Sequence, residues 1–335
     1  MLNAKRHSFH KFLLVLFYFA LAIGVTYPLV RVMSTHLFGD FLTDSYQTAR
    51  HVWWIGHALE NGESIFQQST LGYPEGLQGA WLWANPLEYF PAWLFALVMP
   101  LNTALNLMLL LQLTLNGLSA YVLINHLTGK RFYPALLGGV IFMSFPALQG
   151  RVYGGHVGVL ALWGVPLLLY ILFRLREESS PRLYAFAGFS FMLGIAGNST
   201  LLVYYLMPTV GLLLMMQIVT KQWTWLRRSI VACLIGGVLS LGLLLPLLIE
   251  TVNTPQYSLS VSETVRFSAD LLAFASPSMD GHPLFASLDY PNQVLGLNLV
   301  EMPVKAALDH QRVVGALLLD AVSFQNHNNI GIADG

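Results

Sequence analysis

Long apolar runs alternate with polar segments along most of this chain. The first run covers Phe12–Val30, and further runs lie at Asn106–Ile124, Phe132–Phe145, Val157–Phe173, Leu183–Ala196, Leu201–Val219 and Ile230–Leu248. A membrane-spanning helix needs about 20 predominantly apolar residues. The pattern therefore predicts an all-α fold, a polytopic transmembrane helix bundle over residues 1–250.

One apolar stretch, Leu87–Leu101, does not fit this pattern. It is shorter than the others and is broken by Pro91 and Pro100. We expect it to be re-entrant or to lie in the membrane interface, because irregular backbone at membrane depth must be buried in protein. The alternative is that it crosses the membrane fully.

Basic residues gather in four short segments between the apolar runs. These segments hold 11 of the 17 Lys and Arg residues: Lys5, Arg6, Lys11, Lys130, Arg131, Arg174, Arg176, Arg182, Lys221, Arg227 and Arg228. Short loops rich in Lys and Arg face the cytoplasm. This choice puts residues 34–84 on the other side as a large first outer loop, and it requires that Leu87–Leu101 does not cross.

Composition narrows the class of protein. Only 10% of the residues are charged and the mean hydropathy is +0.59, whereas soluble domains carry about 25% charged residues. The formal net charge is zero, so nucleic acid is not an expected partner. The first run is too long for the apolar region of a signal peptide. We therefore expect an uncleaved first helix and a multi-pass protein of the plasma (inner) membrane.

The first outer loop contains a predicted helix at Thr43–Leu59. Its threonine suits the N-cap position, Asp44 lies in the first turn where a carboxylate is favoured, and Gly62 follows as a stop signal. Trp53 and Trp54 lie beside the apolar positions of this helix. Such a helix is expected along the membrane interface, with its tryptophans at headgroup depth.

The end of the chain has a different character. From Thr251 to Gly335 no apolar run is long enough to span a membrane. We expect residues 251–335 to form either a small outer-side segment or part of an incomplete copy of something longer.

Several motifs, taken in order, resemble one family of membrane enzymes. They are Thr43-Asp44-Ser45 with Trp53-Trp54, Gly62, Gly72-Tyr73-Pro74-Glu75-Gly76, Phe145-Pro146, Gly155-His156, Ser268-Ala269-Asp270-Leu271-Leu272 and Ser276-Pro277. Together they resemble the GT-C superfamily, integral membrane glycosyltransferases that use polyprenyl-phosphate-linked sugars and include protein O-mannosyltransferases and aminoarabinose transferases. The resemblance implies that an acidic residue of the first outer loop deprotonates the acceptor. Asp44 matches that position best, and Asp40 is second.

Moving a sugar from a lipid phosphate needs a base for the acceptor proton and a group that stabilises the departing phosphate. Asp44 is a candidate base, against the alternative of a helix-capping carboxylate. Asp40 is a candidate base or metal ligand, against a solvated turn after a glycine. Arg50 and His51 lie about two turns further along the same helix and are candidate phosphate ligands, or groups that contact solvent and lipid headgroups.

A second candidate region is the outer loop between two spans, where Arg151 and His156 flank two glycines, Gly154 and Gly155. Glycine allows close backbone approach to a ligand, and arginine is a strong phosphate partner. A plain tight turn between helices is the alternative. No metal-binding signature stands out, although Asp40, Asp44 and His156 would suit a divalent metal ion such as Mg²⁺ or Mn²⁺ if they converge.

The sequence thus favours a GT-C-type glycosyltransferase with its active site on the extracytoplasmic face. Its expected partners are a polyprenyl-phosphate-linked sugar, a lipid, glycan or protein acceptor, and membrane lipids. The alternatives are a lipid-linked-sugar flippase or other transporter, and an inactive truncated member. A transporter would place ionisable residues inside its spans, whereas here the charge lies mainly in the outer loops.

Overall fold

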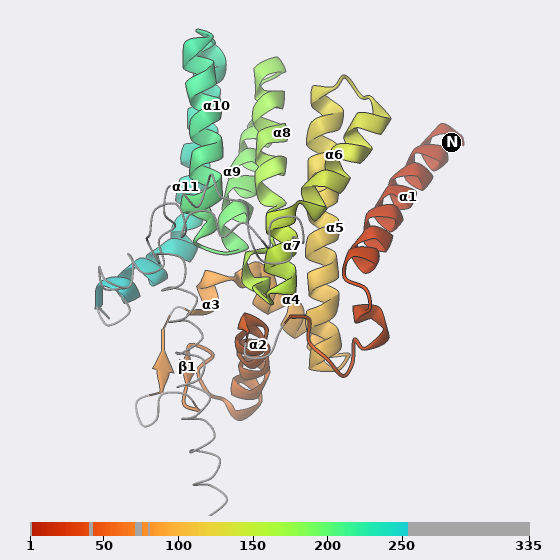
Figure 1. Cartoon of the computed structure of the whole chain (residues 1–335). Helices are drawn as coiled ribbons and strands as arrows, with labels where there is room; N and C mark the ends of the chain where they lie inside the picture. Colours follow the sequence, from red (N-terminus) through yellow and green to blue (C-terminus); the bar gives the residue numbers. More distant parts are fainter. Residues whose placement is uncertain (1, 40–42, 71–75, 80, 254–335) are drawn as a thin grey trace, which may run out of the picture. The chain divides into compact units, whose positions relative to one another are not determined.

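Apolar helices packed side by side form the body of the protein (Figure 1). A computed structural model describes residues 2–39, 43–70, 76–79 and 81–253. Its elements are α1 (Leu2–Val25), η1 (Leu29–Arg31), α2 (Asp44–Asn61), β1 (Gln67–Gln68), β2 (Leu77–Gln78), α3 (Trp81–Ala84), α4 (Pro86–Ala96), α5 (Leu101–Leu127), α6 (Phe132–Ser144), α7 (Pro146–Tyr153), η2 (Val157–Val159), α8 (Gly164–Glu177), α9 (Pro181–Ala196), η3 (Leu202–Leu206), α10 (Met207–Val219) and α11 (Trp223–Asn253).

Length and composition identify the helices that could cross a membrane. Four segments of the described chain qualify, namely Leu101–Leu127, Val157–Glu177, Leu202–Val219 and Trp223–Glu250, and the bent pair α6 and α7 would make a fifth. The prediction of a mostly helical chain with several helices that could cross a membrane is therefore confirmed.

Two of the predicted spans are shorter than the membrane requires on their own. The apolar part of α1 is Lys11–Val25, because the helix ends three residues before Pro28 and does not reach Val30. Helix α9 has 16 residues, or about 24 Å at 1.5 Å per residue, against a hydrocarbon core of about 30 Å.

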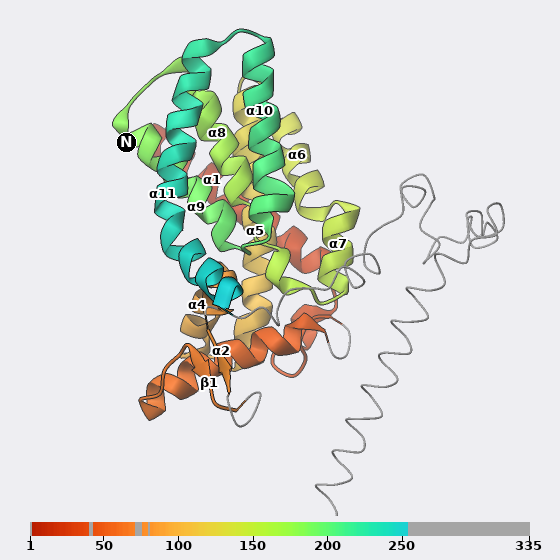
Figure 2. The ribbon, with the colours of Figure 1, turned by 90° about the vertical axis from the view of Figure 1, so that its left-hand side faces the viewer.

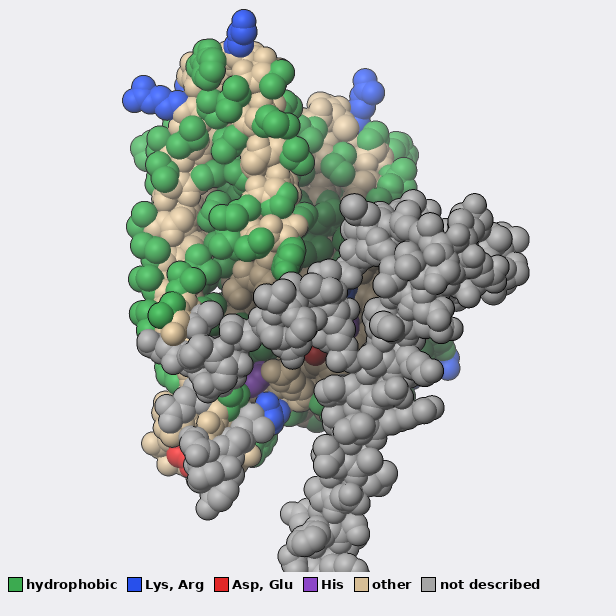
Figure 3. Space-filling model, turned by 60° about the vertical axis from the view of Figure 1, so that its left-hand side comes forward, with side chains coloured by type: hydrophobic (Ala, Val, Ile, Leu, Met, Phe, Trp, Pro, Cys, Tyr) green, Lys and Arg blue, Asp and Glu red, His purple; other side chains and the backbone are tan. Residues whose placement is uncertain are grey.

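The basic turns lie at one end of the bundle. The turns α5–α6, α8–α9 and α10–α11 are all at the top of Figure 1, and Lys and Arg side chains project from that end in Figure 3. Helices α2, α3 and α4 lie at the opposite end. Three of the four basic segments thus lie at the same end of the bundle, as the sequence pattern predicts.

Glycines let the first helix pack closely against its neighbours. The side chain of Tyr18 on α1 is fully buried, and its hydroxyl donates a hydrogen bond to the Leu136 carbonyl at 2.9 Å. A Cβ atom on Gly117 of α5 would lie 2.5 Å from the Tyr18 ring, and one on Gly139 of α6 would lie 2.1 Å from the Tyr18 hydroxyl oxygen. Small residues at such contacts are typical of helix packing in membranes.

Two asparagine side chains of helix α5, Asn116 and Asn106, form hydrogen bonds with backbone groups of non-helical segments. Asn116 Nδ2 donates to the Leu160 carbonyl at 2.8 Å, and the Leu162 N–H donates to Asn116 Oδ1 at 3.1 Å. Asn106 bonds three backbone groups of the loop after η1 in the same way. Because non-helical backbone inside an apolar bundle has no water to pair with, these amides allow the loops to enter it.

Helices α2 and α4 close the end of the bundle that lies away from the basic turns. Figure 2 shows α2 lying across this end, and its buried residues Val52 and Ile55 pack with Ala92 of α4 and Met108 of α5. At 11 residues, α4 is about 16 Å long and too short to cross a bilayer. It lies at the end where α5 begins, as expected for a segment that does not cross.

Candidate active site

The first turn of α2 presents a carboxylate at the end of the bundle that lies away from the basic turns. Asp44 is the first residue of this helix, after Thr43 at the N-cap. The helix ends at the left-handed Gly62 (φ 67°), so both ends follow the predicted signals. A carboxylate in the first turn is stabilised by the helix dipole. The Asp44 side chain remains 57% exposed, so a ligand could reach it.

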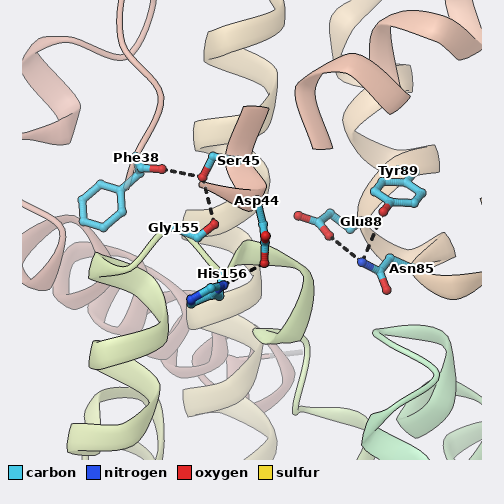
Figure 4. A network of polar contacts seen from close by, with 8 residues as sticks. All are labelled: Phe38, Asp44, Ser45, Asn85, Glu88, Tyr89, Gly155 and His156. Atoms are coloured by element: carbon cyan, nitrogen blue, oxygen red, sulfur yellow. Dashed lines mark hydrogen bonds and ion pairs between the residues drawn. The ribbon is translucent and has the colours of Figure 1, made fainter. Parts of the chain in front are cut away.

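His156 meets Asp44 across 112 residues of sequence. Its Nδ1 lies 2.7 Å from Asp44 Oδ2 (Figure 4). A neutral imidazole that donates Nδ1–H to a carboxylate keeps Nε2 as its acceptor, on the opposite side of the ring. The same arrangement orients the histidine of hydrolase triads. The contact therefore holds Oδ2 of Asp44 in place and fixes the orientation of the His156 ring.

Two glycines and a serine bring this pair together. Gly39 (φ 114°) and Gly155 (φ 70°) pack so closely that a Cβ atom on Gly39 would lie 2.5 Å from the Gly155 Cα. Ser45 Oγ is 2.7 Å from the Phe38 carbonyl oxygen and 3.1 Å from that of Gly155, placed to donate to either (Figure 4). The first outer loop is thus fastened to the turn that carries His156. The close approach predicted at Gly155 is to the protein's own loop, because Gly39 occupies that space.

A second acid lies behind Asp44, inside the protein. Glu88, on the first turn of α4, is 7% exposed, and its Oε2 accepts a hydrogen bond from Asn85 Nδ2 at 3.4 Å. Burial raises its pKa from 4.5 to about 8; the Asn85 bond lowers the pKa, and the negative charge of Asp44 raises it further. A carboxyl group in this environment holds its proton at neutral pH.

Backbone packing and a small cavity complete the surroundings of Glu88. A Cβ atom on Gly158 would lie 2.5 Å from Asn85 Nδ2 and 3.4 Å from Glu88 Oε2, so the η2 turn covers the acid. A cavity of about 20 Å³ is lined by Glu88, by Ser45 and Thr48 of α2, and by apolar residues of α5. Its volume is enough for a single water molecule.

A protein-family model described as "Domain of unknown function (DUF6311)" matches residues 12–298 of the 335 residues. The chain belongs to this family. No curated protein matches the chain. The family description states no activity, so the chemistry of this DUF6311 protein is argued from its geometry.

The DUF6311 structure gives His51 a different position from the predicted one. The side chain is 1% exposed; Gln68 Nε2 donates to its Nδ1 at 2.7 Å, and its ring lies 5.4 Å from that of Tyr89. Burial, with the positive charge of Arg50, lowers its pKa to about 4. A neutral, covered imidazole is a poor ligand for a donor phosphate, so His51 is better explained as part of the α2–α4 contact.

The two candidate arginines of the DUF6311 domain differ in exposure. Arg50 is half-buried; its Nε has no hydrogen-bond partner among the described residues, and burial lowers its pKa. Arg151 is exposed on α7, and its carbonyl accepts the backbone N–H of His156 at 2.9 Å. Arg151 is therefore the better placed to meet a ligand at the Asp44–His156 pair.

Other predictions for the DUF6311 chain have mixed outcomes. Asp40 and residues 254–335 lie outside the described residues. Within the described ranges, no three His, Cys, Asp or Glu side chains gather where they could hold a metal ion, so a site that includes Asp40 stays a prediction. Of the two tryptophans expected at headgroup depth, Trp53 is 45% exposed but Trp54 is fully buried.

Sequence reasoning missed Glu88. The available signal was a lone carboxylate in an apolar stretch, two residues after Pro86. Such a residue is costly to bury and is a functional candidate by default. It was overlooked because a glutamate in the first turn of a helix also has an ordinary explanation, the helix dipole.

Proposed function

We propose that the protein is an integral membrane glycosyltransferase of GT-C type. It moves a sugar from a polyprenyl-phosphate donor to an acceptor on the extracytoplasmic side of the plasma membrane, with Asp44 as general base. The observation that carries the proposal is the short contact between Asp44 and His156. It joins an exposed carboxylate of the first outer loop to the turn before η2, at the end of an apolar helix bundle.

The position of the pair suits a lipid-borne donor. Helix α2, which begins at Asp44, lies at the end opposite the basic turns, and His156 contacts Asp44. This is the outer end if those turns are cytoplasmic. A polyprenyl chain keeps its phosphate near the membrane surface, where the spanning helices end. The base and the phosphate ligand for this substrate are therefore needed near the ends of helices. Asp44, the candidate base, is the first residue of α2, and Arg151, the candidate phosphate ligand, lies in the last turn of α7.

The chemistry assigns a role to each side chain. Asp44 takes the proton of the acceptor hydroxyl or amine while that atom bonds to the anomeric carbon of the sugar. The bond from this carbon to the phosphate oxygen breaks, and its electron pair stays on the phosphate. His156 holds the carboxylate through Oδ2, and the exposed Arg151 stabilises the departing phosphate.

The test uses the purified protein in proteoliposomes with a panel of undecaprenyl-phosphate-linked sugars. Release of undecaprenyl phosphate, with the sugar appearing on water or an added acceptor, is the expected result for at least one donor. Movement of an intact donor between leaflets without cleavage would support a flippase and would contradict the proposal.

A further inference from the structure

Glu88 is surrounded by groups that cannot neutralise a negative charge. Its contact is Asn85, a neutral amide. Helix α5 contributes the amides of Asn106 and Gln112 to the same cavity, and η2 contributes backbone at Gly158. No described cation is paired with it.

The titratable groups nearby also leave Glu88 as an acid. The elements packed against α4 carry titratable groups on α2 (Asp44, Tyr46, Arg50, His51, His57 and Glu60), α5 (Tyr121 and His126) and α9 (Arg182 and Tyr184). Tyr89 lies on α4 itself, and His156 comes directly before η2. Among the charges of the described residues, only the negative charge of Asp44 affects the pKa of Glu88, and it raises this pKa. His156 is engaged with Asp44, and His51 is neutral at physiological pH.

Glu88 and Asp44 form a pair of acids with opposite environments. Figure 4 shows the Glu88 carboxyl group pointing from α4 toward the side on which Asp44 lies. Asp44 is more than half exposed to solvent and contacts the imidazole of His156. Glu88 is buried and has no cationic partner among the described residues, which favours its neutral form. When two neighbouring carboxyl groups have such different environments, the exposed group can act as the base and the buried group stays neutral.

We propose that Glu88 is a positioning residue that, by remaining protonated, leaves the site with one carboxylate instead of two and so allows an anionic lipid phosphate to bind beside Asp44. The inference rests on the proposed function. If Glu88 loses its proton, a second negative charge appears in a poorly solvated position near the phosphate. The two anions then repel each other, and phosphate affinity falls.

Two measurements test this role without relying on catalysis. The first is infrared spectroscopy of the carboxyl C=O stretch in wild type and Glu88→Gln over pH 6–10. A band of a protonated carboxyl group, present at pH 7 in wild type, lost near pH 8 and missing from Glu88→Gln, is expected. A carboxylate spectrum for Glu88 at pH 7 would overturn the proposal.

The second measurement is the affinity for undecaprenyl phosphate in nanodiscs over the same pH range. Wild type should lose on the order of tenfold in affinity above pH 8, as one added nearby charge would cause, while Glu88→Gln stays constant. Glu60→Gln, which changes an exposed acid near the other end of α2, should behave like wild type.

The outcomes separate this inference from the proposed function. Binding of undecaprenyl phosphate that does not change with pH in wild type overturns the role of Glu88 and leaves the glycosyltransferase proposal standing. This result needs no variant, so a poorly folded Glu88→Gln protein does not remove the test. Failure of undecaprenyl phosphate to bind at any pH overturns both.

Discussion

Replacing Glu88 by glutamine should change how the stability of the protein depends on pH. The pKa of Glu88 is about 8 in the folded protein against 4.5 for the free side chain. Between these values the folded protein keeps the proton that the unfolded chain has released. Stability therefore falls as pH rises through this window and levels off above it.

The size of the effect follows from the same two values. Each pKa unit corresponds to about 1.4 kcal/mol, so folding stability should drop by about 4–5 kcal/mol between pH 4.5 and pH 8 because of Glu88. Glutamine has no proton to release, and its amide keeps an oxygen for Asn85 Nδ2. The variant should therefore gain stability relative to wild type as pH increases.

Unfolding of both proteins in detergent, followed by helical circular dichroism at pH 5, 6, 7, 8 and 9, measures the difference. Taking the difference at each pH cancels the other titrating groups, which the two proteins share. Glu60→Gln serves as the matched control. Because Glu60 is exposed, its replacement should leave the dependence of the unfolding free energy on pH the same as in wild type. A constant difference between wild type and Glu88→Gln over pH 5–8 would refute the reasoning.

Three further predictions concern the fold that supports the site. Gly155→Ala should destabilise the protein by about 1–3 kcal/mol, because Gly155 has φ 70° and its Cβ would lie 2.3 Å from the N-cap threonine of α2; Gly150→Ala, with no atom in reach, should be tolerated in the same unfolding assay. Asn116→Leu should cost about 1–3 kcal/mol by removing two hydrogen bonds to backbone groups of the segment before α8, and an unchanged midpoint would contradict this. Cysteines at Ser64 and Ser179, both exposed, should react with impermeant reagents from opposite sides, and labelling from the same side would reject the topology.

Local signals in the sequence predicted the local structure well. Helix α2 begins after Thr43 and stops at Gly62 because capping depends on a few neighbouring residues. The same approach did not predict that His51 is buried. Seven residues separate it from Asp44, so the two share a helix face, but periodicity does not say where along that face another helix packs. Helix α4 covers His51 and leaves Asp44 open.

Long-range contacts were beyond the sequence pattern. Asp44 and His156 were each candidates by residue type, yet no pattern in the sequence between them, a separation of 112 positions, fixes their distance. The role of Gly155 was interpreted as room for a ligand, whereas its missing side chain makes room for Gly39. Glu88 required knowledge that η2 folds back over the start of α4, which only the tertiary structure provides.

The central claim is that Asp44 removes the acceptor proton. The most direct measurement is single-turnover sugar transfer by wild type, Asp44→Asn and Glu60→Gln, with a donor identified from the undecaprenyl-phosphate panel. The account predicts that Asp44→Asn lowers the rate by about 10²–10⁴-fold with unchanged donor binding and unfolding, while Glu60→Gln transfers at the wild-type rate. Transfer by Asp44→Asn at the wild-type rate would contradict it.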